Sequence, residues 1–166
     1  MRPDLPIASD SWLRASWRAR PGSFVALMSL YESNRVRVGA LLGDLRSRQG
    51  RYLSRVPGEC PLELVVLEQG AYTTVLALNS LFPETERGES DEPLRLPDLE
   101  VRVYHDAALA EASRLGAPRS HPALGPVDAR LPAALDIRWR RNILLNKWLE
   151  YLADTGHAPG TFHVAD

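Results

Sequence analysis

The first part of the chain carries a clear helical pattern. From Ser23 to about Leu45, apolar residues recur every three or four positions, which is the period of an amphipathic helix. The segment Pro21-Gly22-Ser23 supplies a start signal for this helix. Asn34 interrupts the apolar face. We expect its amide to find hydrogen-bond partners, because an unsatisfied buried polar group costs about 1–3 kcal/mol.

Three short runs of β-type residues follow the helix. They occupy positions 51–56, 62–68 and 71–79. Gln69-Gly70 separates the last two runs, which favours a hairpin. A two-residue turn there would place Val65 opposite Thr74, whereas a longer loop would change the register. Apolar residues occupy both faces of this hairpin, so the pattern predicts central strands that are covered on both sides.

The next apolar residues alternate with polar ones, as in a strand with one buried face. This strand runs from Leu99 to Tyr104, and the same parity points His105 toward the covered face. Residues 107–115 are rich in alanine and stop before a glycine, so we expect a short Ala-rich helix there. Asp106 directly precedes this helix and can cap it.

Two polar segments interrupt the predicted elements. Residues 83–98 are acidic and contain prolines, so we expect an exposed loop. Residues 116–132 are rich in glycine and proline, which predicts a second irregular connection. A final helix then covers residues 135–152 and ends near Gly156. It is apolar over much of its circumference, as in a helix that packs deeply or completes an oligomer interface.

These elements together predict an α+β fold with one core, which the length of 166 residues also favours. An antiparallel sheet of about four strands would be flanked by a long N-terminal helix, the short Ala-rich helix and the C-terminal helix. We expect a single α+β domain over residues 22–156, a flexible N-terminal segment over residues 1–21 and a tail over residues 157–166.

The composition narrows the possible function classes. The 20 basic and 21 acidic residues leave a net charge of −1, so no overall field favours nucleic acid. No stretch approaches the roughly 18 apolar residues of a membrane span. Cys60 is the only cysteine, which excludes an internal disulfide and favours a reducing compartment. We therefore expect a cytoplasmic protein.

Common motifs for cofactors, metals and nucleophiles do not occur in the chain. It has neither a P-loop nor a glycine-rich dinucleotide fingerprint, so no cofactor is indicated. His121, His157 and His163 fall in predicted loops or in the tail, without the spacing of metal ligands, so no metal site is indicated. Cys60 precedes Pro61 in a predicted loop, which is not the setting of an activated thiol.

Four separated segments resemble the YqiB-like family of uncharacterised bacterial cytosolic proteins, domain of unknown function 1249. The matching residues are Tyr31-Glu32-Ser33-Asn34; Val66-Leu67-Glu68 with Tyr72-Thr73-Thr74; Val101-Arg102-Val103-Tyr104-His105-Asp106-Ala107 with Ala110-Glu111; and Asn142 with Trp148-Leu149. The resemblance covers about residues 22 to 156 and implies a shared fold and shared candidate positions. It names no reaction. The chain departs from the family pattern in the acidic loop and in the proline-rich connection.

The end of the strand at Tyr104 is the main candidate site. His105 and Asp106 can form a catalytic or ligand-binding pair, with Tyr104 and Glu111 nearby. For Asp106 the competing interpretation is a helix cap, worth about 1 kcal/mol. For His105, a packing role at the rim of the core and a binding role are equally favoured. A histidine titrates near neutrality, which makes it useful for binding as well as for packing.

Three further candidates are polar residues on largely apolar helices. Glu32, Asn34 and Asn142 could contact a ligand. They could instead form a buried hydrogen-bond network that fixes helix against sheet. The network is favoured, because buried polar groups in folded proteins are normally satisfied.

The pattern favours a non-catalytic module that binds an unknown small molecule or protein between the sheet and the terminal helices. This interpretation predicts an apolar cavity with His105 or Asn34 at its edge. The alternative is a hydrolase in which His105 is the general base, assisted by Asp106, Glu32 or Glu111. That alternative requires the titratable side chains to converge on one accessible point.

The last helix supports a third possibility, a homodimer formed through its apolar surface. Such a dimer would need apolar and aromatic side chains on the outer face of the helix. It predicts that Trp148 and Tyr151 are exposed in the monomer.

Overall fold

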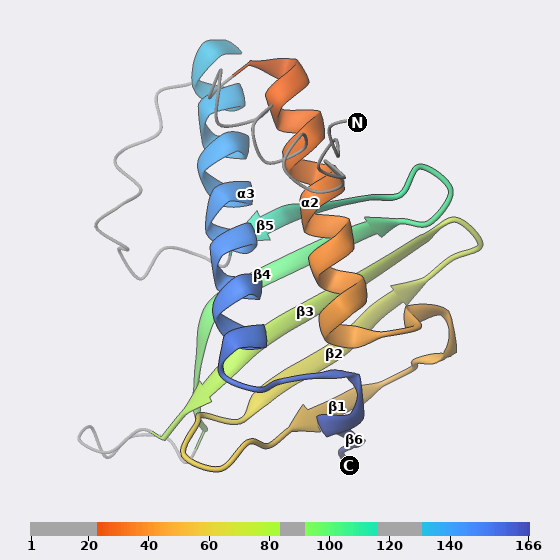
Figure 1. The fold of residues 1–166 in the computed structure, drawn as a ribbon, viewed down its shortest axis with the longest axis vertical. Coiled ribbons are helices and arrows are strands. Elements are labelled where there is room, and N and C mark those ends of the chain that lie inside the picture. The colour runs from red at the N-terminus through yellow and green to blue at the C-terminus, as the bar shows by residue number, and fades with distance from the viewer. Residues whose placement is uncertain (1–22, 84–91, 116–130) are drawn as a thin grey trace, which may run out of the picture.

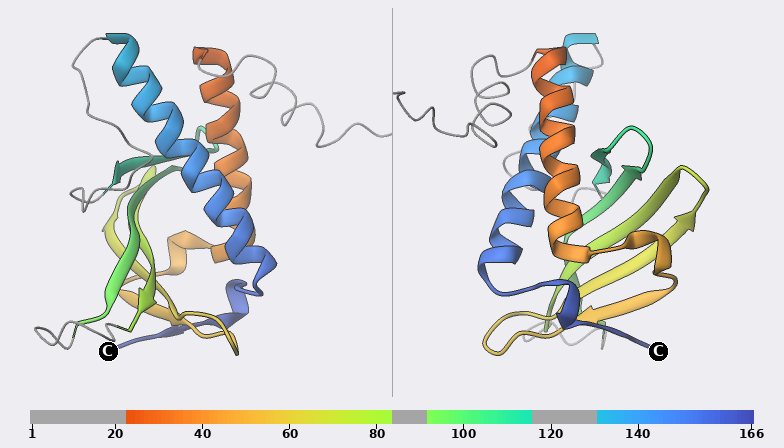
Figure 2. Two further views of the ribbon diagram at one scale, coloured as in Figure 1. Left: turned by 90° about the vertical axis from the view of Figure 1, so that its left-hand side faces the viewer. Right: turned by 45° about the vertical axis from the view of Figure 1, so that its right-hand side comes forward.

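Six antiparallel strands form one sheet, and two helices lie over one of its faces (Figures 1 and 2). This is a computed structural model, and it describes residues 23–83, 92–115 and 131–166. The N-terminal segment 1–21, most of the acidic loop and most of the proline-rich connection lie outside the described residues. The α+β class and the antiparallel sheet are confirmed. The predicted four strands and three helices are wrong, because the described chain forms six strands and two α-helices.

The described elements follow one another through short connections. The helices are α2 (Phe24–Leu42) and α3 (Leu131–Asp154), with two short 3-10 helices, η1 (Leu45–Ser47) and η2 (Pro159–Thr161). The strands are β1 (Arg51–Ser54), β2 (Leu62–Gln69), β3 (Thr73–Phe82), β4 (Leu94–Tyr104), β5 (Leu109–Leu115) and β6 (Phe162–Val164). The order in the sheet is β5-β4-β3-β2-β1-β6. Successive strands from β1 to β5 are therefore neighbours, and β6 completes the sheet beside β1.

Helix α2 begins where the sequence predicts. The Ser23 hydroxyl accepts a hydrogen bond from the Ala26 backbone N–H at 3.2 Å, which satisfies a donor of the first turn. The helix ends at Leu42 rather than near Leu45, because Gly43 follows with a φ of 69°, a conformation that favours glycine. Helix α3 lies beside α2 and runs in the same direction (Figure 1).

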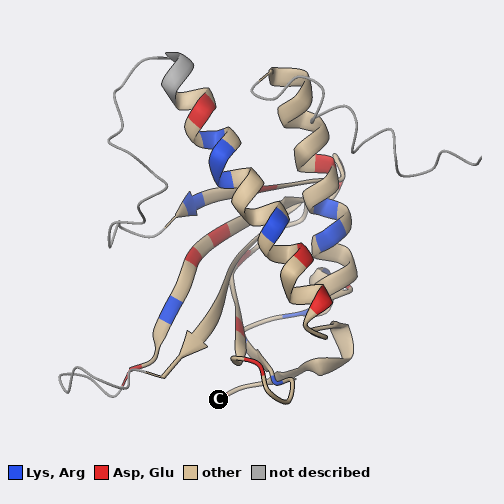
Figure 3. Cartoon of the chain, turned by 60° about the vertical axis from the view of Figure 1, so that its left-hand side comes forward, with Lys and Arg blue, Asp and Glu red and all other residues tan. Residues whose placement is uncertain are grey.

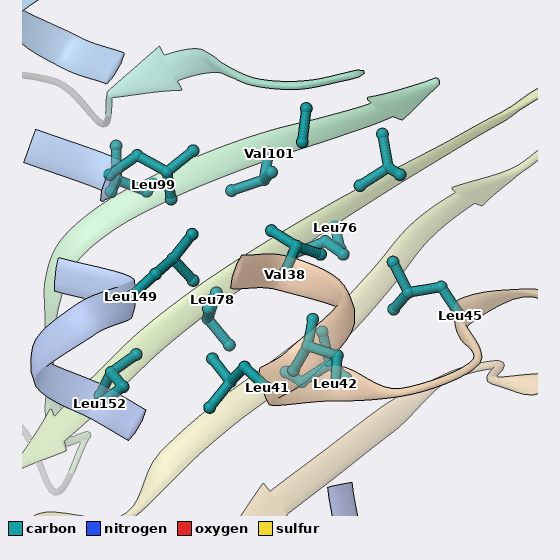
Figure 4. Packing of buried hydrophobic residues seen from close by; sticks show 14 of the residues in the cluster. Val38, Leu41, Leu42, Leu45, Leu76, Leu78, Leu99, Val101, Leu149 and Leu152 are labelled. Carbon is teal, nitrogen blue, oxygen red and sulfur yellow. The ribbon is translucent and has the colours of Figure 1, made fainter. Parts of the chain in front are cut away.

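The main core lies between the sheet and the C-terminal halves of both helices (Figure 4). Its leucines and valines come from α2, α3 and the middle strands, and burial of each leucine contributes about 1.5–3 kcal/mol. The labelled side chains are Val38, Leu41, Leu42, Leu45, Leu76, Leu78, Leu99, Val101, Leu149 and Leu152. A smaller cluster joins the N-terminal halves of the helices around Leu27, Leu30 and Tyr31.

The predicted Ala-rich helix is wrong, because Leu109–Leu115 form strand β5. This strand pairs with β4, so that Val103 lies opposite Ala110 and Val101 opposite Ala112. Ala110 and Ala112 are buried, and α2 packs against this strand. Their small side chains allow the helix to come close. Helix propensity differs by less than about 1 kcal/mol per residue among ordinary amino acids, so strand pairing and packing override it.

The strands also differ in extent and register from the prediction. Strand β4 begins at Leu94, so it includes the end of the predicted acidic loop. The turn between β2 and β3 is longer than two residues, because the Gly70 N–H donates to the Thr73 carbonyl oxygen. As a result, Val65 lies opposite Ala77. Strand β6 comes from the residues predicted as a tail, and it pairs with β1.

The sequence predicts central strands covered on both sides, and within the described chain the two helices cover one face of the sheet (Figure 2). On the other face, a buried carboxylate joins two strands to β2. Glu63 accepts hydrogen bonds from Arg51 Nε at 2.7 Å and from Arg95 Nε at 2.8 Å. Burial alone would raise the pKa of Glu63, but the hydrogen bonds from Arg95 and Arg51 outweigh it and lower that pKa.

Candidate functional site

His105 lies just beyond β4, at the rim of the sheet. Its Nε2 atom is 2.8 Å from the Thr74 hydroxyl oxygen, and the ring is half-buried. Burial lowers the pKa of His105, and so do the positive charges of Arg46 and Arg35, while two nearby carboxylates oppose this shift. The ring is therefore held by one hydrogen bond and is uncharged at neutral pH.

Asp106 does not cap a helix, because the chain turns directly into β5. Its Oδ1 accepts a hydrogen bond from the Ala107 backbone N–H at 2.9 Å. Ala108 completes this turn with a φ of 53°. Glu32 is exposed on α2 and forms no hydrogen bond or ion pair within the described part of the chain.

Glu111 interacts with two tyrosines, Tyr104 and Tyr31. The Tyr104 hydroxyl donates a hydrogen bond to Glu111 Oε1 at 2.7 Å. Tyr31 of α2 is 5% exposed, and its hydroxyl lies within electrostatic range of the same carboxylate without a hydrogen bond of standard geometry. Burial, followed by the charge of Glu111, raises the pKa of Tyr31 to about 12. Both phenols therefore stay protonated.

Asn34 and Asn142 meet in a fully buried chain of amides between the two helices, which we call the asparagine seam (Asn34, Asn142 and Asn146). Asn142 Oδ1 accepts from Asn34 Nδ2 at 3.2 Å and from the Ala112 backbone N–H at 2.8 Å. Asn34 Oδ1 accepts from Asn146 Nδ2 at 3.0 Å. Asn142 Nδ2 donates to the Arg138 carbonyl oxygen at 2.8 Å. The seam ties α2, α3 and β5 together. Asn34 and Asn142 thus form a buried network as the sequence favoured, whereas Glu32, expected in the same network, is exposed and lies outside it.

The predicted candidates therefore form separate groups rather than one site. Among the described residues, no hydrogen bond or ion pair joins His105 to Glu32, Asp106 or Glu111. Asp106 lies close enough to influence His105 electrostatically, but the carboxylate of Glu111 is engaged by Tyr104. The geometry assembles no acid–base constellation from these residues.

A pocket of about 220 Å³ is lined by residues from the C-terminal half of α3, the end of β3 and the start of β4. These parts of the three elements lie at the end of the sheet opposite the turn between β4 and β5 (Figure 1). Buried Ser80, Leu152 and His157 line its inner part. Glu59 and Tyr151 are exposed and line its mouth, where the Tyr151 hydroxyl donates to Glu59 Oε2 at 3.4 Å. Neither His105 nor Asn34 lines this pocket.

His157 is fixed by a buried hydrogen-bond chain beside the pocket. The ring is 4% exposed, and its Nδ1 atom lies 2.7 Å from the Ser54 hydroxyl oxygen. Ser54 is fully buried and lies 2.6 Å from the Thr161 hydroxyl oxygen. Burial lowers the pKa of His157, and the charge of Glu59 opposes this shift. These contacts attach the C-terminal segment to β1.

Local sequence patterns do not point to this pocket, because its lining comes from four separated segments. Trp148 and Tyr151 lie one turn apart on α3 and both line the pocket, so this aromatic pair is the sequence feature that could have indicated it. The dimer hypothesis requires both to be exposed. Tyr151 is 54% exposed, whereas Trp148 is half-buried and lines the pocket. Cys60, the sole cysteine, also lines it.

Two further findings concern the described residues as a group. No three of their histidine, cysteine, aspartate and glutamate side chains are arranged to hold a metal ion. Neither α2 nor α3 is long and apolar enough to cross a membrane.

The comparisons with known proteins gave a match to a protein family. No curated protein and no solved structure is similar enough to this chain to count as a match. A family of proteins described as "Protein of unknown function (DUF1249)" matches residues 37–158, which is more than half of the 166 residues. This match confirms the resemblance seen in the sequence, and the chain belongs to the DUF1249 family.

Proposed function

We propose that the protein is a non-catalytic module that binds a small, largely apolar molecule in the pocket beside α3. The supporting observation is the pocket itself. Apolar side chains such as Leu96, Leu144 and Trp148 make most of its lining, and a few polar groups converge at its inner end. This combination is typical of small-molecule sites. Its volume of about 220 Å³ suits a ligand with a single ring or a short chain.

The hydrolase alternative finds less support. His105 is bonded to Thr74, and the carboxylates that would assist it are exposed or engaged elsewhere. A homodimer through α3 keeps one supporting observation, the exposure of Tyr151. Light scattering that shows a monomer at all concentrations would exclude the dimer.

A binding test can use phenethyl alcohol, an uncharged single-ring probe, with the full-length protein. We expect saturable 1:1 binding by titration calorimetry. Cys60 provides a second readout, because it is the only cysteine and lines the pocket. At ten times its Kd the probe occupies about nine-tenths of the pockets, so alkylation of Cys60 by iodoacetamide should slow about tenfold.

Two matched variants locate the binding. Leu144→Trp adds a large side chain inside the pocket and should abolish the calorimetric signal. Val36→Trp adds a similar side chain at an exposed position on α2 and should leave binding unchanged. Absence of binding to the wild-type protein, or equal binding by Leu144→Trp, would contradict the proposal.

A further inference from the structure

The described residues that line the pocket include an acidic side chain but no lysine or arginine. Glu59 is the one aspartate or glutamate among them. His157 adds no positive charge, because burial lowers its pKa. An anionic ligand would therefore lose hydration without gaining a counter-charge. A cationic ligand would gain one from Glu59.

The aromatic side chains favour the same sign of charge. Phe82 lines the pocket from the end of β3, and Trp148 and Tyr151 line it from α3. The face of an aromatic ring attracts a cation, most strongly for tryptophan. The contact of 3.4 Å between the Tyr151 hydroxyl and Glu59 Oε2 brings one of these rings beside the carboxylate. The mouth of the pocket thus combines an aromatic surface with a negative charge.

The charges on the surrounding surface are consistent with this preference (Figure 3). Arginines gather on the N-terminal half of α3, away from the pocket. The C-terminal half carries Glu150 and Asp154. Glu150 pairs with Lys147 at 3.0 Å and with Arg37 of α2 at 3.6 Å, so Asp154 is the carboxylate without an ion pair among the described residues of this half. Asp154 adds a negative charge at this end of α3, and a negative charge raises the local concentration of cations.

We propose that the pocket binds a small organic cation, an ammonium group attached to a single ring or a short apolar chain. The ring would occupy the apolar interior, and the ammonium group would lie at the mouth between the aromatic side chains and Glu59. The volume sets the size of the ligand, because an apolar cavity of about 150 Å³ already holds benzene. The pocket of about 220 Å³ leaves room for a short substituent. This inference rests on the proposed function of the same pocket.

The test compares three probes with one ring and different charges: phenethylamine, phenethyl alcohol and hydrocinnamate. At neutral pH the amine should bind about tenfold more tightly than the alcohol, since cation–π contact and the carboxylate both act on it. Hydrocinnamate should bind more weakly than the alcohol. Titration calorimetry and protection of Cys60 from iodoacetamide measure both differences on the full-length protein.

Glu59→Gln isolates the contribution of the carboxylate. This exposed residue can change without loss of the fold, and the variant should lose most of the preference for the amine while it keeps its affinity for the alcohol. Glu68→Gln, which removes an exposed carboxylate at the other end of β2, should keep the full preference. If the alcohol binds and the amine has no advantage, the cation proposal is wrong while the binding function stands. If none of the three probes binds, the proposed function itself fails.

Discussion

Helix α3 builds two different environments along its length. Its middle turns carry Asn142 and Asn146 into the asparagine seam, where each amide is buried and hydrogen-bonded. Its last turns carry Trp148 and Tyr151 to the pocket, where aromatic side chains border about 220 Å³ of open volume. The seam holds the fold together, whereas the pocket leaves apolar surface available to a ligand.

The two histidines show the same contrast between the ends of the sheet. Burial lowers the pKa of both rings. His105 is half-buried at a rim of arginines and carboxylates, and its ring makes one hydrogen bond, to Thr74. His157 is almost fully buried, is bonded to Ser54 and lines the pocket. Whether a histidine lines the pocket therefore depends on its position in the fold, and the sequence motif around His105 did not indicate it.

Loss of the seam should produce the largest effect. Asn142→Ala leaves the buried donors of Asn34 and Ala112 without an acceptor, so we expect a loss of about 2–4 kcal/mol in the free energy of unfolding. Urea denaturation measures it. Lys147→Ala, an exposed change on the same helix, should cost less than about 0.5 kcal/mol.

This variant also tests the contrast between the seam and the pocket. Asn142→Ala should bind phenethyl alcohol as the wild-type protein does, because Asn142 does not line the pocket. A folded Asn142→Ala protein that no longer binds the probe would show that the two environments are coupled. A double-mutant cycle with Asn34→Ala then measures the energy of the shared hydrogen bond.

Loss of His157 should produce the next largest effect. His157→Ala removes a buried ring and the partner of the Ser54 hydroxyl, so we expect a loss of about 2–3 kcal/mol. The same change enlarges the pocket and should alter the affinity for phenethyl alcohol. A variant with unchanged stability and unchanged affinity would contradict the role given to this ring. Thr161→Val, on the same hydrogen-bond chain but outside the pocket lining, separates anchoring from ligand contact.

The seam and the pocket also differ in how far the sequence could predict them. Asn34 and Asn142 stand out as polar residues on apolar helix faces, and such residues require partners inside the same core. Their network was therefore predictable. Asn146 lies one turn after Asn142 on the same face of α3, so the helical spacing was a signal that could have added it to the network. The pocket was missed because its lining depends on how distant segments meet.

Strand β5 shows a second limit of local patterns. Its alanines favour a helix when their intrinsic propensity is considered alone. Pairing with β4 and packing under α2 decide the outcome instead, and neither contact is encoded within residues 109–115. The alternating residues from Leu99 to Tyr104 were predicted as a strand and do lie in β4, because one buried face imposes a period of two on the sequence, although β4 begins earlier, at Leu94.

Acid should destabilise the protein through its buried histidine. The folded pKa of His157 lies below its ordinary value of 6.5, so the unfolded chain binds a proton more readily. The stability contributed by the neutral ring is present above about pH 6.5 and is lost as the pH falls toward the folded pKa. Urea denaturation at roughly half-unit pH steps between about pH 7.5 and pH 5 measures how the free energy of unfolding falls with pH. His157→Gln should flatten this dependence.

The smallest effect is expected at the other histidine. His105→Ala removes a half-buried ring whose hydrogen bond to Thr74 lies at the rim, so we expect a loss of about 1 kcal/mol or less. The slope of stability against pH should change less than in His157→Gln, because solvent screens a half-exposed group. His105→Ala should bind phenethyl alcohol with the wild-type affinity. A loss of binding in this variant, with the fold intact by circular dichroism, would move the functional site to the turn between β4 and β5. The contrast between the two ends of the sheet would then be reversed.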